Sequence, residues 1–304
     1  MGGAEPLLRL HAPQLEELET QRVFIGDDAV ARMCADGLLP RESLSLEDAG
    51  ITSIGAVALA GCPRLANLQI LNLNDNPIGA DGIAAILTSP HLTQLQELRT
   101  SHTDNPREAL LPVLFASPPR PTLSLNSWGH AFLLNRSPKD GTQLRVVGPR
   151  QGFEWPASGV CPEPLAGLSF EQFGFTPTTW KRLRAWLTGQ TLASLTFMDC
   201  QLHNDDLPEL LKLVEQVRPS EVNLRDNEIG VNGCKALAAC PALATVRVLD
   251  LTGNPIRLSG AMAIAESENR GKLKTFRAAS LGRTLSVAER KKLTAAFKGV
   301  KVYL

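Results

Sequence analysis

The sequence is short of aromatic residues, which make up 5% of its 304 positions, and it has no lysine before Lys139. No run of about 18 apolar residues occurs, which argues against a membrane-spanning helix. The start of the chain shows no basic segment followed by an apolar run, so no secretory signal is visible. The six cysteines include no Cys-x-x-Cys pair, and a chain of this length needs no disulfides. We therefore expect a cytoplasmic protein with reduced thiols and no membrane association.

Motifs for catalysis are also missing. The five histidines are scattered and form no metal-binding spacing. The sequence has no phosphate-binding glycine loop of either common pattern and no Gly-x-Ser-x-Gly nucleophile turn. These absences predict a protein that is not an enzyme and that uses no cofactor or metal.

The net charge is zero, but the charges are divided unevenly along the chain. Residues 1–128 carry 8 basic and 15 acidic side chains, whereas residues 129–304 carry 23 basic and 16 acidic ones. The last 35 residues hold ten basic groups, from Arg270 to Lys301, against one acid, Glu289. Such asymmetry marks either a partner surface or a solvated terminal helix with a basic face.

A repeat dominates the rest of the sequence. Leucine pairs with the pattern Leu-x-Leu-x-x-Asn-x-Ile begin at 44, 71 and 98, and again at 168, 195, 222, 249 and 276. Every step within each series is 27 residues, a regularity that indicates stacked structural repeats. The alternating leucines predict a short strand with one buried face, and the asparagine can satisfy backbone groups where the strand turns. Cys200 occupies the asparagine position of its repeat, so we interpret it as buried structure rather than as a nucleophile.

The segment from Leu68 to Gly79 reads LQILNLNDNPIG, and it resembles the ribonuclease-inhibitor-like family of leucine-rich-repeat proteins. The longer stretch around it is similar to leucine-rich-repeat proteins that bacteria with large genomes carry in many copies. The resemblance covers about 44–115 and 165–281. It implies an α/β leucine-rich-repeat solenoid, a horseshoe with a parallel concave sheet and outer helices. For function it implies inhibitors, scaffolds, GTPase-activating proteins or effectors.

The register breaks between 116 and 164. Two apolar stretches, 132–135 and 144–147, flank the turn-forming residues 137–141, which predicts an inserted β-hairpin. Near the end, Ser286 and Glu289 form a capping-box pattern that predicts a terminal helix, followed by a final strand. We therefore divide the chain into an N-terminal cap with a degenerate first repeat (1–43), a first array (44–128), an irregular insert (129–164), a second array (165–281) and a C-terminal cap (282–304).

Two surfaces are candidate binding sites. Outward positions of a solenoid's strands collect on one face, and loops on a rigid scaffold often carry function. The alternatives are that a solvated strand face is polar in any case, and that the tryptophans of the insert fill a gap where a helix is missing. On the strands the candidates are Glu47, Asp48, Asn72, Asn74, Asp75, Arg99, His102, Glu171, Met198, Asp199, Asn223, Arg225, Asp226, Asp250 and Arg277. In the insert they are Trp128, His130, Arg150, Phe153 and Trp155.

The favoured function is that of a scaffold or adaptor that binds another protein, as a monomer. One alternative is a regulator that activates or inhibits a partner enzyme such as a small GTPase. The other is nucleic-acid binding through the basic C-terminal segment, which the scarcity of aromatic stacking groups there disfavours. The acids of the first array predict a partner with a basic patch, and charge reversal of Glu47, Asp48 and Asp75 should weaken its binding.

Overall fold

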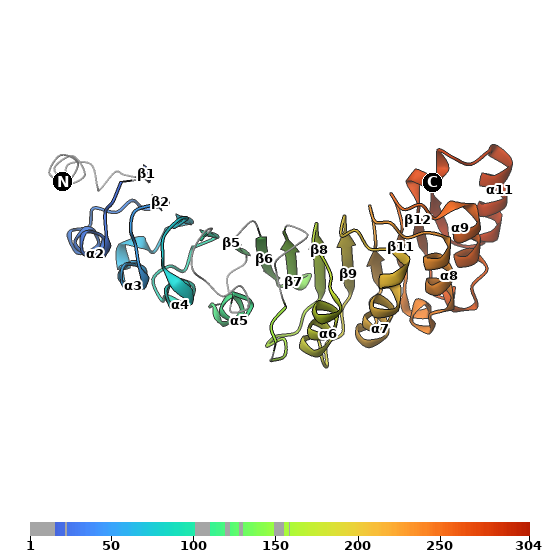
Figure 1. Ribbon diagram of the computed structural model, residues 1–304, viewed down its shortest axis with the longest axis horizontal. Helices are drawn as coiled ribbons and strands as arrows, with labels where there is room; N and C mark the ends of the chain where they lie inside the picture. Colours follow the sequence, from blue (N-terminus) through green and yellow to red (C-terminus); the bar gives the residue numbers. More distant parts are fainter. Residues whose placement is uncertain are drawn as a thin grey trace. The chain divides into compact units, whose positions relative to one another are not determined.

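The computed structural model describes residues 16–21, 23–100, 110–118, 122–127, 130–148, 155–157 and 159–304. The chain folds as two compact units, an N-terminal unit (Met1–Pro138) and a C-terminal unit (Lys139–Leu304). In each unit, parallel strands alternate with helices that lie on one side of the sheet (Figure 1). None of the helices in the described ranges is long and apolar enough to cross a membrane.

The N-terminal unit is built from strand–helix repeats. Strands β1 to β5 pair in parallel and in chain order, and β6 closes this part of the sheet by pairing antiparallel with β5. The elements are β1 (Glu17–Gln21), α2 (Asp27–Asp36), β2 (Ser43–Glu47), α3 (Ser53–Ala60), η2 (Pro63–Leu65), β3 (Ile70–Asn72), α4 (Gly79–Thr88), β4 (Glu97–Arg99), α5 (Leu110–Ala116), β5 (Thr122–Ser127) and β6 (His130–Ser137).

The C-terminal unit repeats the same plan, with strands β7 to β13 parallel and in chain order. The elements are β7 (Gly141–Val147), β8 (Gly167–Glu171), α6 (Pro177–Trp186), β9 (Ser194–Met198), η4 (Asn204–Asp206), α7 (Leu207–Val217), β10 (Glu221–Asn223), α8 (Val231–Ala239), η5 (Pro241–Thr245), β11 (Val248–Asp250), α9 (Arg257–Ala265), η6 (Glu268–Arg270), β12 (Thr275–Arg277), α10 (Ala279–Gly282), α11 (Val287–Ala296) and β13 (Lys301–Tyr303).

The predicted register is confirmed in the strand pairing. Leu44 lies opposite Leu71, and Leu71 opposite Leu98, so each 27-residue step moves the chain one strand along the sheet. The structure extends the first array by one strand, because Leu98 pairs with Leu125 of β5. All of these leucines are fully buried. Their alternation with polar residues therefore buries one face of each strand and leaves the other face for solvent or a partner.

The two predicted strands of the insert, β6 and β7, are present. No helix follows β5, because only residues 128 and 129 separate it from β6. On the other side of the turn at 138–140, Leu144 of β7 pairs with Leu168 of β8, a step of 24 residues rather than 27. The insert therefore adds a strand to the sheet of each unit.

The terminal helix begins as the sequence predicts. The Ser286 side chain accepts the amide proton of Glu289, and the Glu289 carboxylate accepts the amide proton of Ser286 at 2.8 Å. This reciprocal pair satisfies two amides that have no partner inside helix α11. The helix then leads into β13, whose Val302 pairs with Phe276 of β12.

Candidate functional site

The asparagines of the repeat form a ladder inside the protein. Asn227 is 4% exposed, and its side-chain oxygen accepts the amide protons of Cys200 and Leu202, both at 3.1 Å. Its amide nitrogen donates to the carbonyl of Phe197 at 2.8 Å and to two carbonyls of its own turn. Asn76 makes the equivalent bonds in the N-terminal unit. The predicted role of this residue is confirmed, and its bonds also join each repeat to the one before.

The residue before the asparagine has a left-handed backbone. Asp48, Asp75, Asp199 and Asp226 have φ values between 50° and 57°. Gly253 takes the same place one repeat later, with a φ of 80°. Aspartate tolerates this conformation better than most residues because its short polar side chain can bond locally. Part of the acidic pattern on the strand face is therefore set by backbone geometry.

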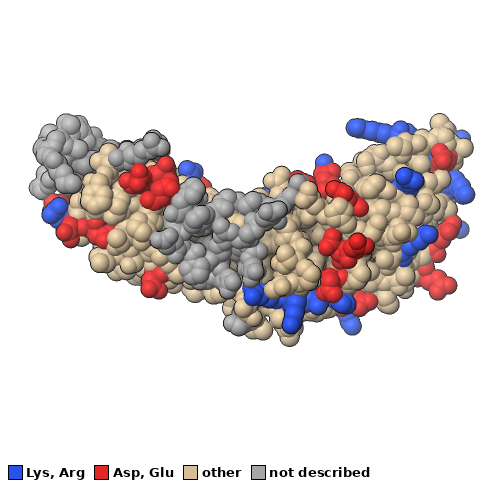
Figure 2. Space-filling model, viewed as in Figure 1, with Lys and Arg blue, Asp and Glu red and all other residues tan. Residues whose placement is uncertain are grey.

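The N-terminal strand face, defined as the outward side of β1–β4 with the turns after β2 and β3, is acidic. Asp48 and Asp75 are exposed, and Glu47 is half-buried. Arg99 is the one basic side chain among these described positions, and its Nε lies 2.9 Å from Oε1 of Glu97. Figure 2 shows acidic side chains grouped over the region of β1 and β2. The carboxylates of this face are Glu17, Glu19, Glu47, Asp48, Asp75 and Glu97.

Three of these carboxylates, those of Glu17, Glu19 and Glu97, are absent from the sequence-based candidates. Glu17 and Glu19 lie on β1, which pairs with β2 in the same register as the later strands. Glu97 lies opposite Ile70 on β3. A stricter extension of the 27-residue register to the degenerate first and fourth repeats would have found them.

The amides predicted on this face are largely occupied by internal bonds. Asn72 is 8% exposed, and its Nδ2 donates to Oγ of Ser45 at 3.1 Å and to Oε2 of Glu47 at 3.0 Å. Its Oδ1 accepts the amide proton of Asn74. These bonds hold the Glu47 carboxylate in place on the face. Asn72 is therefore a positioning residue here rather than an exposed contact.

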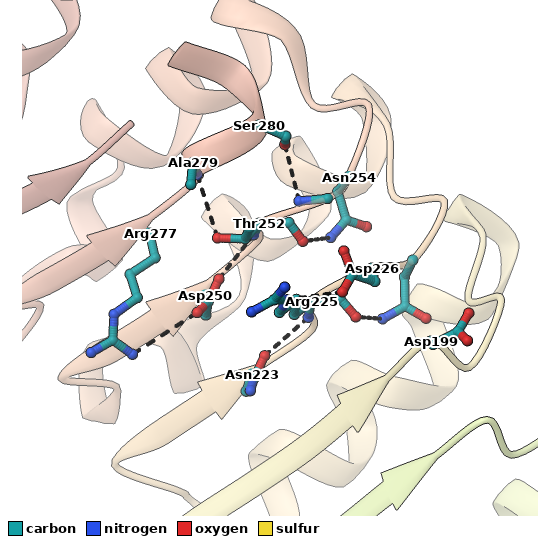
Figure 3. A network of polar contacts seen from close by, with 12 residues as sticks. Asp199, Asn223, Arg225, Asp226, Asp250, Thr252, Asn254, Arg277, Ala279 and Ser280 are labelled. Carbon is teal, nitrogen blue, oxygen red and sulfur yellow. Dashed lines mark hydrogen bonds and ion pairs between the residues drawn. The ribbon is translucent and has the colours of Figure 1, made fainter. Parts of the chain in front are cut away.

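The strand face of the C-terminal unit has paired charges instead. Arg225 contacts Asp226 at 2.8 Å, and the Asp226 carboxylate raises the pKa of this guanidinium. Asp250 is 8% exposed, accepts the amide proton of Thr252 and lies 3.9 Å from the guanidinium of Arg277 (Figure 3).

Toward the start of the C-terminal unit, the Arg145 guanidinium contacts the Glu171 carboxylate, and Asp199 accepts a bond from Gln172. Asn223 accepts the amide proton of Arg225, and Met198 is half-buried. The described acids and bases of this face largely neutralise each other.

At the other end of this face lies an aromatic residue that the sequence-based candidates omit. Tyr303 on β13 is 51% exposed, and its ring lies 5.8 Å from the guanidinium carbon of Arg277. Tyr303 pairs with Arg277 in the strand register.

The insert residues have a different fate from the one expected of exposed anchors. Trp155 is fully buried, with its ring 5.5 Å from that of Phe170 and 5.3 Å from that of Trp186. His130 is 3% exposed. Their burial contradicts the prediction that these two side chains contact a partner and supports the alternative, in which they fill the core. Trp128, Arg150, Phe153 and the strand candidate His102 lie outside the described residues.

All six cysteines are free, and most are kept protonated by burial. Burial raises the pKa of Cys161 to about 11 and that of Cys234 to about 12. Cys200 is 3% exposed, and its thiol donates to the carbonyls of Phe170 and Met198, as the asparagine amide does elsewhere. The interpretation of Cys200 as buried turn structure is confirmed. Among the described residues, no group of acids, histidines and cysteines is arranged to hold a metal ion.

Cys34 and Cys62 form an exception, because their thiols interact between neighbouring repeats. The hydrogen bond from Cys34 lowers the pKa of Cys62 to about 6. We expect the ultraviolet absorbance of the full chain to show one thiolate forming near that pH, well below the ordinary range of about 8.5. In Cys34→Ala the donor is lost, so this step should move to higher pH. Unchanged titration in the variant would contradict the assigned cause.

Comparison with known proteins agrees with the repeat geometry. A model of the leucine-rich repeat matches residues 64–87, 220–238 and 242–265. A crystal structure of an internalin from Listeria monocytogenes is similar at 15% identity, over 97% of this chain and 82% of that one, with a TM-score of 0.35. A search of curated sequences gives no match. The matched repeats and the observed sheet define the chain as a leucine-rich-repeat protein with an α/β solenoid fold.

Proposed function

We propose that the chain is a cytoplasmic scaffold that binds another protein, and that the N-terminal strand face is its main contact surface. The observation that carries this proposal is the concentration of six carboxylates against one arginine on that face. Neighbouring strands lie about 4.8 Å apart, so these like charges repel one another in the free protein. A partner with a basic patch would relieve this repulsion and be guided to the face.

The structure favours a binding role over a purely solvated surface because the carboxylates are positioned. Two bonds from Asn72 and its neighbours hold Glu47, while Asp48 and Asp75 sit in fixed left-handed turns. Preorganised groups lose less conformational entropy on binding than free side chains. The assignment to the ribonuclease-inhibitor-like group and a bacterial source are part of the same proposal, supported by the 27-residue period and the α-helix in most repeats.

The test removes charge without disturbing the backbone. Lysine at Asp48 or Asp75 would be strained in the left-handed region, so asparagine is the better replacement. We expect the variant Glu47→Gln, Asp48→Asn, Asp75→Asn to bind its partner at least about tenfold more weakly, since each close charge pair contributes more than 1 kcal/mol. Affinity purification with the wild-type chain identifies the partner, and a titration at two salt concentrations measures the loss.

The matched control neutralises three exposed acids elsewhere in the N-terminal unit, with Asp28→Asn, Glu42→Gln and Asp81→Asn. Asp28 lies on α2 and Asp81 on α4, away from the strand face. This control keeps the same net charge as the test variant, so it should retain affinity. Equal binding by the test variant and the wild type would refute the assignment of the face.

A further inference from the structure

A cavity of about 430 Å³ opens in the C-terminal unit between two loops. One loop connects α9 to β12, and the other connects α11 to β13. Its charged lining consists of Arg270, Lys274, Lys298 and a single carboxylate, that of Glu268. The cavity therefore has an excess of two positive charges. Its volume falls in the range of about 300–1,000 Å³ that is usual for small-molecule sites.

The three cations of the cavity are differently held. A guanidinium nitrogen of Arg270 donates to the carbonyl of Ala296 at 3.2 Å, which ties the first loop to the end of α11. Within the described part of the chain, no ion pair joins Lys274 or Lys298 to a carboxylate. Two ammonium groups therefore remain available beside a guanidinium that is already fixed in position.

The positive charge continues onto the neighbouring strands. The amide of Lys274 donates to the carbonyl of Arg247 at 2.8 Å, and the amide of Lys301 donates to the carbonyl of Lys274 at 2.8 Å. These three exposed residues thus follow one another across β11, β12 and β13, at strand spacings of about 4.8 Å. Like charges this close repel one another, and a bound polyanion would remove the repulsion.

Glycines keep the cavity open. The positions that a Cβ would take on Gly271 and Gly299 are both free of neighbouring atoms. Gly299 needs to be glycine for its backbone, because its φ is 80°. Gly271 has an ordinary right-handed backbone with a φ of −53°, so conformation does not require glycine there. The missing side chain at Gly271 leaves space within the cavity.

We propose that this cavity binds a small organic anion that carries several phosphate groups. Arg270, Lys274 and Lys298 contact the phosphate oxygens, while Arg247 and Lys301 add to the attracting field. Guanidinium and ammonium groups supply donors only, which suits phosphate oxygens. The residues that line the cavity include no aromatic side chain for base stacking, so a small phosphorylated ligand fits better than a nucleic-acid strand.

Inorganic tripolyphosphate is the probe for this site, with binding to the full chain measured by calorimetry at low salt. We expect saturable binding to one site. The variant Lys274→Gln, Lys298→Gln should lose at least about tenfold in affinity, since two charge-assisted contacts are removed. Gly271→Phe keeps every charge but fills the cavity, so a similar loss is expected from it. The matched control, Lys291→Gln with Lys292→Gln on exposed positions of α11, should bind as the wild type does.

Several results would overturn the proposal. Absence of tripolyphosphate binding by the wild type is the first, and equal weakening by the α11 control is the second, because it would indicate diffuse attraction. Retained affinity in Gly271→Phe would place the phosphates outside the cavity. Tighter binding of a single-stranded oligonucleotide, unaffected by Gly271→Phe, would assign the basic surface to nucleic acid. Melting temperatures close to that of the wild type establish that the variants are folded.

Discussion

Replacement of Asn227 by alanine should lower the free energy of unfolding by about 3 kcal/mol. The side chain is 4% exposed and makes five hydrogen bonds to backbone groups. Alanine leaves the buried amides of Cys200 and Leu202 without this partner, and each buried unsatisfied group costs about 1–3 kcal/mol. Partial relaxation and water entry reduce the sum. Urea unfolding followed by circular dichroism measures the change, and stability should fall without a new fold.

Asn223 provides the control from the same repeat. Its side chain is half-buried and accepts one amide proton, that of Arg225. Asn223→Ala should therefore cost less than about 1 kcal/mol, because water can replace the single bond. If both alanine variants lost the same stability, the special role of the buried ladder would be refuted.

The ladder also explains how far the sequence could predict this fold. The leucine spacing and the asparagine position predicted the strands, the turns and the 27-residue register, because each depends on local patterns that recur. The pattern did not reveal that Asn227 bonds to Phe197 and Cys200 of the previous repeat. That arrangement depends on how the repeats stack, which a single repeat does not specify.

The candidate acids show a second limit. Asp75 and Asp226 were selected as binding residues because they lie next to outward strand positions, yet their left-handed backbone gives them a structural reason to be aspartate. Gly253, which occupies the same position one repeat later, was the signal that could have indicated this. Glu47 has no such backbone requirement, so it is the better indicator of a binding surface.

The cavity and the buried insert residues were beyond prediction for a different reason. Arg270 and Lys298 come from loops of adjacent repeats, and only the stacking brings them together. Trp155 lies in a segment without regular structure, where periodicity gives no information about burial. The sequence left exposed anchor and core filler as alternatives, and the structure decides between them.

Trp155→Ala should destabilise the C-terminal unit by about 4 kcal/mol. The indole is fully buried and lies edge-on to Phe170 and Trp186, in a cluster of aromatic rings that extends to Phe197. Removal of a buried tryptophan loses its hydrophobic transfer energy and leaves a cavity, at a typical cost of about 3–5 kcal/mol. Hydrogen exchange of the amides of β8 and β9 measures the loss where it occurs.

Tyr303→Ala is the matched aromatic control in the same unit. Its ring is 51% exposed on the terminal strand, so its removal should cost less than about 1 kcal/mol. The pair of variants also separates the two interpretations of the insert. A core residue loses stability first, and binding to a partner falls only as the folded fraction falls. If Trp155→Ala kept full stability but lost the partner, Trp155 would instead be a contact residue, exposed in the complex.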